Sequence, residues 1–272
     1  VDIFFVISGY VITSSLSART SKNFKDFISG FFERRIKRLI PALIPFTVIT
    51  GILICFFNPY PSQSLKTGIT SLFGLSNFYL LKISTDYFAS STLLNAFTHT
   101  WSLDVEEQFY IVFPLLIWFT GFGKKTKNST RNLILSSIFL VLLSFVSYVY
   151  LFQINQSAAY FLMPTRFWEM AAGCLTFLFL EKKFLFTSLL CKLNSVVIFI
   201  LLAGVLFLPV SAALFTTMLV VFLTSILMMC LKKGDRIYKL LTHDLSLHVG
   251  KISYSLYLWH WTVLCISRWT IG

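Results

Sequence analysis

Eight apolar runs follow one another along this chain of 272 residues, with only short polar breaks between most of them. A helix of about 20 residues crosses the hydrocarbon core of a bilayer. Backbone in hydrocarbon must satisfy its hydrogen bonds internally, so runs of this length fold as helices. We therefore predict an all-α integral membrane bundle of about eight spans. The runs cover residues 1–17, 39–57, 102–122, 132–152, 160–180, 194–211, 213–231 and 252–270.

Composition supports this fold class and argues against nucleic acid as a partner. Hydrophobic residues make up 56% of the chain and charged residues only 12%, whereas soluble proteins average roughly 25% charged residues. The net charge is +12, but the basic residues lie in short loops and form no continuous basic face. We expect a multi-pass membrane protein with no soluble domain in this chain and no nucleic-acid partner.

A ninth run, residues 67–83, is shorter and contains Gly68, Gly74, Asn77 and Lys82. Loops on the cytoplasmic side of a membrane carry an excess of Lys and Arg. If the ninth run does not cross, 19 of the 23 cations share one side. We therefore predict a re-entrant or interfacial segment over 67–83 and a long outer loop over 58–101. The 19 cations are Arg19, Lys22, Lys25, Arg34, Arg35, Lys37, Arg38, Lys124, Lys125, Lys127, Arg131, Lys182, Lys183, Lys192, Lys232, Lys233, Arg236, Lys239 and Lys251.

The segment 98–110 is the first candidate site, because it sets titratable side chains against an apolar run. It contains His99, Trp101, Asp104, Glu106 and Glu107. Acids at a membrane edge commonly mark function. On this topology they face outward.

A local explanation competes with that hypothesis. Ser102 can serve as a helix N-cap, and acids in the first turns are favoured by the helix dipole. This explanation does not account for His99 and Trp101 standing beside the acids. Both interpretations stay open from spacing alone.

The second candidate is the basic cluster that includes Arg34, Arg35 and Arg38, directly before an apolar run. Positions three apart share a helix face, so Arg35 and Arg38 can fork around phosphate groups. The alternative is a cluster that anchors the helix in anionic lipid.

The third candidate is Arg166 with Glu169, three residues apart and able to form an ion pair on one helix face. Gly173, one turn further on, allows another helix to approach closely. A structural pair is the simpler interpretation of these residues.

The fourth candidate is His260, between Trp259 and Trp261 in the last apolar run. An unpaired polar group in hydrocarbon is costly, so this histidine has either a structural hydrogen-bond partner or a chemical role.

The five cysteines carry no metal or redox pattern in their spacing. They lie in or beside apolar runs, where free cysteine packs as a small hydrophobe. We expect no metal site and no disulfide framework. The residues are Cys55, Cys174, Cys191, Cys230 and Cys265.

Taken together, five segments resemble those of the bacterial membrane acyltransferase family 3, both in their order along the chain and in their amino-acid sequence. These are O-acyltransferases that modify cell-surface glycans. The resemblance runs from one end of the chain to the other. The matching segments are 1–10, 34–41, 99–110 with Pro114, 166–173 and 253–261.

The resemblance implies a multi-pass enzyme of the bacterial cytoplasmic, or inner, membrane. It implies transfer of an acyl group, usually acetyl, from cytoplasmic acyl-CoA to a hydroxyl of an extracytoplasmic glycan such as lipopolysaccharide. Acyl-CoA, the glycan and membrane lipid are then the expected partners. Arg35 and Arg38 match the family's Arg-x-x-Arg element for the donor, and Arg34 lies beside them as a further candidate.

The resemblance also suggests roles for the other candidates. Glu106, Glu107 and His99 would support catalysis at the outer mouth. A second group would hold the acceptor or brace the site. That group is Arg166, Glu169, Trp101 and His260.

The family's essential histidine lies on a helix preceding the segment that matches Val1 onward, so we expect residues 1–272 to be one incomplete acyltransferase domain, inactive alone. The amino-acid sequences near His99 and Trp259 are similar to those of family members that carry an added extracytoplasmic esterase-like domain. Asp104 stands where the family usually has a small hydroxyl residue, and Thr262 where proline is common. The alternative from another class is a secondary transporter, which would also suit a re-entrant segment and intramembrane polar residues.

Overall fold

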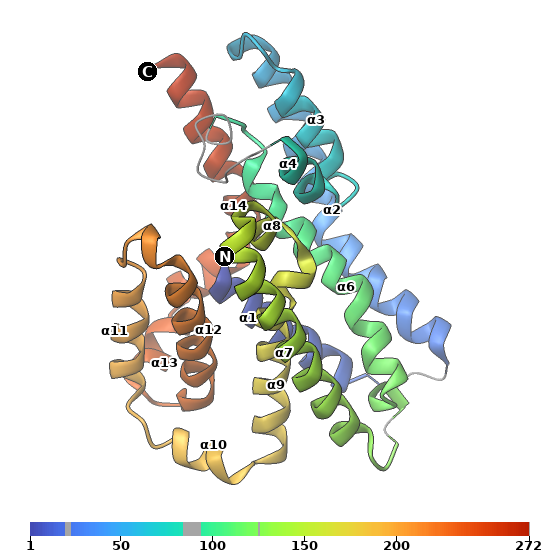
Figure 1. Ribbon diagram of the computed structural model, residues 1–272. Coiled ribbons are helices and arrows are strands. Elements are labelled where there is room, and N and C mark those ends of the chain that lie inside the picture. Colours follow the sequence, from blue (N-terminus) through green and yellow to red (C-terminus); the bar gives the residue numbers. More distant parts are fainter. Residues whose placement is uncertain (20–22, 84–93, 125, 272) are drawn as a thin grey trace. The chain divides into compact units, whose positions relative to one another are not determined.

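The computed structural model describes residues 1–19, 23–83, 94–124 and 126–271. Every regular element within these ranges is a helix (Figure 1), which confirms the all-α prediction. The chain divides into two compact units, and each is described by itself. Unit 1 consists of Val1–Ser21, Leu115–Val149 and Arg166–Gly250. Unit 2 consists of Lys22–Pro114, Tyr150–Thr165 and Lys251–Gly272.

Three helical segments are long and apolar enough to cross a membrane. They are α2 (Phe24–Phe57), α7 (Ser129–Ile154) and Val210–Cys230, which contains α12 (Ala213–Cys230). The number of crossings stays a prediction. The other apolar runs coincide with α1 (Asp2–Ser17), α6 (Trp101–Phe119), α9 (Met163–Lys182), α11 (Ser195–Val205) and α14 (Asp244–Thr270).

Unit 1 contains two glycines that allow α1 and α9 to touch backbone to backbone. A Cβ atom on Gly9 would overlap the carbonyl oxygen of Met170, and one on Gly173 would overlap that of Val6. The prediction that Gly173 permits a close helix approach is therefore confirmed.

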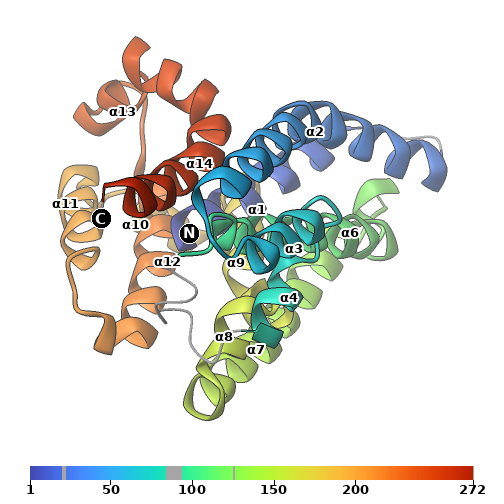
Figure 2. The ribbon, with the colours of Figure 1, turned by 90° about the horizontal axis from the view of Figure 1, so that it is seen from above.

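The apolar core of unit 1 also joins α11 to α12, which lie side by side in both views (Figure 1 and Figure 2). Ile198, Leu202 and Val220 are buried between them. The short helices of this unit are η2 (Phe122–Lys124), α10 (Leu185–Leu190), η3 (Val210–Ala212) and α13 (Arg236–Leu241).

The helix α2 of unit 2 begins well before the predicted run at residue 39. Asn23 caps it, because its side-chain oxygen accepts a hydrogen bond from the Asp26 amide at 2.9 Å. The helix then continues for 34 residues through Pro41 and Pro45. The candidate arginines therefore lie within the helix.

The ninth run forms two short helices instead of one span. They are α3 (Ser62–Ser71) and α4 (Ser76–Ile83), separated by a turn in which Gly74 has a φ of +68°. A positive φ strains any residue with a Cβ, so glycine suits this turn. Neither helix is long enough to cross the bilayer, and whether the pair re-enters the membrane stays a prediction.

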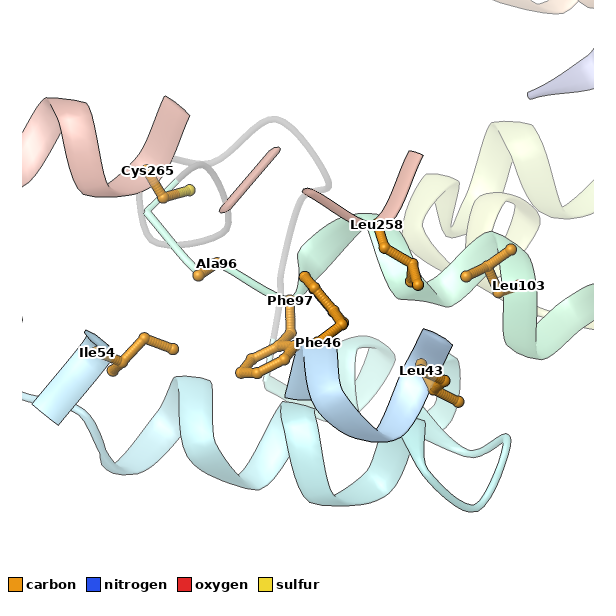
Figure 3. Close-up of a cluster of buried hydrophobic side chains, with 8 residues drawn as sticks. All are labelled: Leu43, Phe46, Ile54, Ala96, Phe97, Leu103, Leu258 and Cys265. Carbon is orange, nitrogen blue, oxygen red and sulfur yellow. The ribbon is translucent and has the colours of Figure 1, made fainter. Parts of the chain in front are cut away.

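The chain after α2 folds back beside it. Phe46 packs on Phe97 with ring centroids 5.6 Å apart, in the apolar cluster of Figure 3. Phe46 lies 11 residues before the end of α2 at Phe57, or about 16 Å along the helix. The segment that contains His99 therefore lies beside the middle of α2. The placement of His99 at the outer edge of the membrane stays a prediction, and residues 84–93 of the predicted outer loop lie outside the described residues.

Candidate functional site

His99 is a buried candidate residue of unit 2. It lies in η1 (Thr98–Thr100) directly before α6, with 5% of its surface exposed. Neither nitrogen of its imidazole makes a hydrogen bond of ordinary geometry within the described residues. Burial, followed by the nearby His260, lowers the pKa of His99 from 6.5 to about 3, and the backbone of Leu258 offsets part of that lowering. The ring is therefore neutral at physiological pH.

Aromatic rings line the surroundings of His99. Ring centroids of His260, Tyr257 and Phe46 lie 5.3, 5.4 and 5.9 Å from its own. The Tyr257 hydroxyl donates to the backbone oxygen of His99 at 2.9 Å and lies 2.6 Å from the hydroxyl of Ser102. Ser102 therefore serves this contact with α14, rather than the predicted N-cap.

His260 is exposed and lies one turn after Tyr257 on α14, with Nδ1 2.6 Å from the Tyr257 backbone oxygen. Two neighbouring residues fix this helix against the chain before η1. The indole of Trp261 donates to the Asn95 backbone oxygen, and Thr262 donates to that of Ala96, each at 3.0 Å. Thr262, where the resemblance leads us to expect proline, thus holds α14 in place.

A second group of contacts joins α2 to α6. The ring of Tyr110 lies under the Arg35 guanidinium, 4.7 Å from its central carbon, and the Tyr110 oxygen is 3.5 Å from Arg35 Nη1. The Tyr110 hydroxyl donates to the carboxylate of Glu106, which is buried. Arg35 and Glu106 were predicted to lie at opposite edges of the membrane. That separation is wrong, because Tyr110 connects them.

Glu106 and Glu107 point in different directions, as adjacent positions about 100° apart on a helix must. Glu106 contacts Tyr110, whereas the carboxylate of half-buried Glu107 lies against the turn at Gly74. A Cβ atom on Gly74 would come within 2.9 Å of Glu107 Oε2. Only Glu106 faces the Arg35 side.

Asp104 has a structural partner that the sequence did not indicate. Its carboxylate accepts a hydrogen bond from the Ser76 amide at the start of α4. The hydroxyls of Ser76 and Thr100 lie 2.8 Å apart beside it. The carboxyl group of Asp104 therefore caps α4 and is occupied by that hydrogen bond.

Trp101 is buried, with its ring 5.7 Å from that of Phe161 in α8 (Gln156–Phe161). Its position is that of a packing residue. Two polar residues nearby were missed from the sequence. Gln108 donates to the Gly74 backbone and to Asn77, both at 2.9 Å, and Asn77 donates to the Phe161 backbone. Only their polarity within an apolar stretch could have identified them.

Arg34 and Arg38 are exposed on α2, whereas Arg35 is half-buried. Arg35 therefore presents a guanidinium group held by Tyr110, and Arg34 and Arg38 present guanidinium groups that solvent can reach. Such a set can bind a multiply charged anion, since guanidinium groups pair with phosphate in a bidentate manner.

Arg166 and Glu169 belong to unit 1 and so to a separate cluster from the residues above. Arg166 Nη1 lies 2.6 Å from Glu169 Oε1, which confirms the predicted pair. Its Nη2 lies 2.9 Å from Asp2 Oδ1, a partner that the sequence did not suggest.

An apolar groove of about 370 Å³ lies between α2 and α3. Gly51, Leu65 and Phe97 are among its lining residues, and none of the residues that line it carries a charge. The titratable candidates therefore lie outside this groove.

Comparison with known proteins identifies the family of the chain. A sequence profile described as "Acyltransferase domain" matches residues 1–268. O-acetyltransferase OatA of Staphylococcus aureus is 30% identical over 279 residues, which cover 97% of this chain and 45% of that protein. Peptidoglycan O-acetyltransferase OatA of Listeria monocytogenes is 30% identical over 287 residues, which cover 98% and 45%.

The chain thus spans less than half the length of these relatives. No solved structure shows a significant similarity to it.

Proposed function

The chain belongs to the acyltransferase family matched over residues 1–268, and from that membership we propose that it is the membrane part of an enzyme that O-acetylates peptidoglycan. The two relatives named above are O-acetyltransferases, and the Listeria protein is named for peptidoglycan. Their names favour peptidoglycan over lipopolysaccharide as the acceptor. A bacterial cytoplasmic membrane, crossed several times, is the setting that the apolar helices favour.

The contact series from Arg35 through Tyr110 to Glu106 is the observation that supports this function best. It brings a guanidinium suited to an anionic donor and a buried acid together within unit 2. A site that transfers a group between two substrates needs both binding elements near each other, because proximity supplies much of the rate.

The proposed reaction exchanges one bond for another. The acceptor hydroxyl loses its proton and attacks the carbonyl carbon of the acyl thioester, so a C–O bond forms and the C–S bond breaks. The thiolate of CoA then takes up a proton. General bases commonly assist such a proton transfer.

In this proposal the arginines hold the donor. Arg35 is fixed by Tyr110, and exposed Arg34 and Arg38 can reach the phosphate groups of acyl-CoA. Glu106 orients Tyr110 by accepting a hydrogen bond from its hydroxyl. His99 is neutral, so its nitrogens can accept from or donate to a hydroxyl of the acceptor.

The alternative, a secondary transporter, rested on the re-entrant segment and the intramembrane polar residues. Family membership favours the enzyme, because this family is described by acyl transfer.

The test uses cells that lack their own peptidoglycan O-acetyltransferase. A full-length parent protein that contains this chain is expressed there, peptidoglycan is purified, and ester-linked acetate is released with mild base and measured. We expect acetate with the wild type and loss of it with Arg35→Ala. Arg131→Ala, an exposed residue of α7, is the matched control and should retain acetate. Acetate on another glycan, with none on peptidoglycan, would refute the proposed acceptor.

The donor needs its own measurement. Binding of acetyl-CoA to the purified protein is followed by calorimetry, with Arg35→Ala and Arg131→Ala compared. We expect weaker binding only with Arg35→Ala. Equal binding by both variants would exclude the donor role of Arg35.

A further inference from the structure

The ion cluster of unit 1 contains two acids and one guanidinium group. The Arg166 guanidinium is 1% exposed and contacts the carboxyl groups of both Asp2 and Glu169, at 2.9 and 2.6 Å. One cation thus serves two acids. An acid left without full compensation inside a membrane protein is costly.

The two acids differ in their access to water. The side chain of Asp2 is 21% exposed and lies in the first turn of α1, where the helix dipole favours a negative charge. Glu169 is fully buried in α9, and neither oxygen has a hydrogen-bond partner of good geometry within the described residues. Glu169 forms an ion pair with Arg166. Asp2 is therefore the acid better able to remain ionised.

The other elements that face Glu169 supply little compensation. Tyr148 of α7 presents its ring to the Arg166 guanidinium at 5.7 Å, and Phe5 of α1 presents its ring at 5.8 Å. These rings keep water away from the cluster.

A proton satisfies Glu169 better than a metal ion does. A cation would lie beside the Arg166 guanidinium and be repelled by it. No group of three or more His, Cys, Asp and Glu side chains that could hold a metal is found in the described part of the chain. Protonated Glu169 can still accept a hydrogen bond from Arg166 through its carbonyl oxygen.

We propose that unit 1 contains a buried proton-binding site, in which Glu169 is the protonated carboxyl group and Arg166 and Asp2 form the ionised pair. The site takes up one proton when the chain folds around it. Intramembrane carboxyl groups of this kind act as proton carriers in membrane proteins.

Infrared spectroscopy of the purified protein in detergent at neutral pH tests this site directly. A protonated carboxyl group gives a C=O stretching band that a carboxylate lacks. The wild-type spectrum minus the Glu169→Gln spectrum should contain this band. Exchange into D₂O should shift the frequency of the band. The difference spectrum for Glu181→Gln, an exposed acid of the same helix, should contain only carboxylate bands. A carboxylate band for Glu169 would refute the proposal.

Thermal stability provides a second measurement. The folded protein binds a proton that the unfolded chain releases above the ordinary pKa of glutamate, about 4.3. Stability should therefore fall as the pH rises from about 6.5 toward 8.5. Glu169→Gln should remove this fall and raise the midpoint above that of the wild type over this range, because an amide has the shape of a protonated acid and takes up no proton on folding.

Three outcomes would contradict the site. Failure of Glu169→Gln to fold would mean that the charge itself is needed. A stability that rises with pH would mean that Glu169 ionises on folding. A midpoint that depends on sodium or potassium concentration, and loses that dependence in Glu169→Gln, would mean that a metal ion occupies the place of the proton.

Discussion

Both units enclose charged or titratable side chains, but they satisfy them differently. In unit 2, His99 has two imidazole nitrogens without hydrogen bonds of ordinary geometry, and Arg34 and Arg38 are exposed. In unit 1, the Arg166 guanidinium is enclosed by Asp2 and Glu169. The exposed cations of unit 2 can bind another molecule, whereas the charged groups of unit 1 pair with one another.

This difference separates two meanings of a buried charge in a membrane protein. Groups with unused donors or acceptors suit a substrate, which can complete their hydrogen bonds. Groups that pair only with one another hold helices together or carry a proton. Family resemblance alone places Arg35 and Arg166 in one catalytic list, but their surroundings suggest different roles.

The largest effect on folding should come from the glycines that bring α1 and α9 together in unit 1. Replacing Gly9 or Gly173 with alanine forces a Cβ atom into the opposing backbone, so stability should fall by about 3 kcal/mol or more. In unit 2, Gly51 meets only Leu65, at 3.6 Å. Gly51→Ala should therefore raise stability by about 0.5 to 1 kcal/mol through helix propensity. Thermal midpoints in detergent measure both effects, and equal midpoints for the three variants would contradict them.

The next largest effect should distinguish the two acids of unit 2. Glu106→Gln removes the charge that accepts the hydrogen bond from the Tyr110 hydroxyl, so O-acetylation should fall by about a hundredfold or more. Glu107→Gln should have a much smaller effect, because Glu107 faces the turn at Gly74. Peptidoglycan acetate in cells with equal protein levels is the measurement. Equal, mild losses would assign both acids a structural role.

Because His99 is neutral in the folded protein, we expect a pH dependence of stability that arises in unit 2. Burial lowers its pKa to about 3 in the fold, whereas the unfolded chain takes up a proton below about 6.5. The unfolded state thus binds more protons, and stability is lost as the pH falls. Between about pH 6.5 and 5 the loss should reach about 2 kcal/mol in a Glu169→Gln background, which removes the opposite pH dependence of Glu169.

His99→Gln should abolish this loss when midpoints are measured over the same pH range. His248→Gln, an exposed position of unit 1, is the control and should leave the loss in place. An unchanged slope in His99→Gln would mean that His99 ionises within the fold.

A smaller effect should come from keeping the charge at Arg35 while changing its shape. Lysine cannot form a bidentate contact with phosphate or match the flat packing of the guanidinium on Tyr110. Arg35→Lys should therefore reduce activity about tenfold. Arg131→Lys in unit 1 should not. Full activity of Arg35→Lys would favour the lipid-anchor alternative.

Much of the fold could be predicted because hydrophobicity and helix geometry act locally. The apolar runs indicated the helices, and the spacing of Arg166 and Glu169 indicated their ion pair, which the structure contains. The different directions of Glu106 and Glu107 followed from helix periodicity. The start of α2 was missed, because its cap at Asn23 lies outside any apolar run.

The rest of the candidate site depends on pairings between distant segments. Nothing in the local sequence indicates that α3 returns along α2, so the packing of His99 against Phe46 could not be predicted. The same packing brings Tyr110 to Arg35, which is 75 residues away in the chain. Position along the sequence was therefore a poor guide to which side chains meet in unit 2.

The smallest effect should come from Asp104, whose charge caps α4 and is therefore not available for chemistry. Asp104→Ala leaves the buried Ser76 amide without its acceptor and should cost about 1 kcal/mol. Asp104→Asn keeps an oxygen acceptor and should cost less. In unit 1, Asn194 caps α11 in the same way but is exposed, so water can replace it and Asn194→Ala should cost less than Asp104→Ala. Acetylation should survive in all three variants. A loss for Asp104→Asn as large as that for Glu106→Gln would instead place Asp104 among the chemical groups of unit 2.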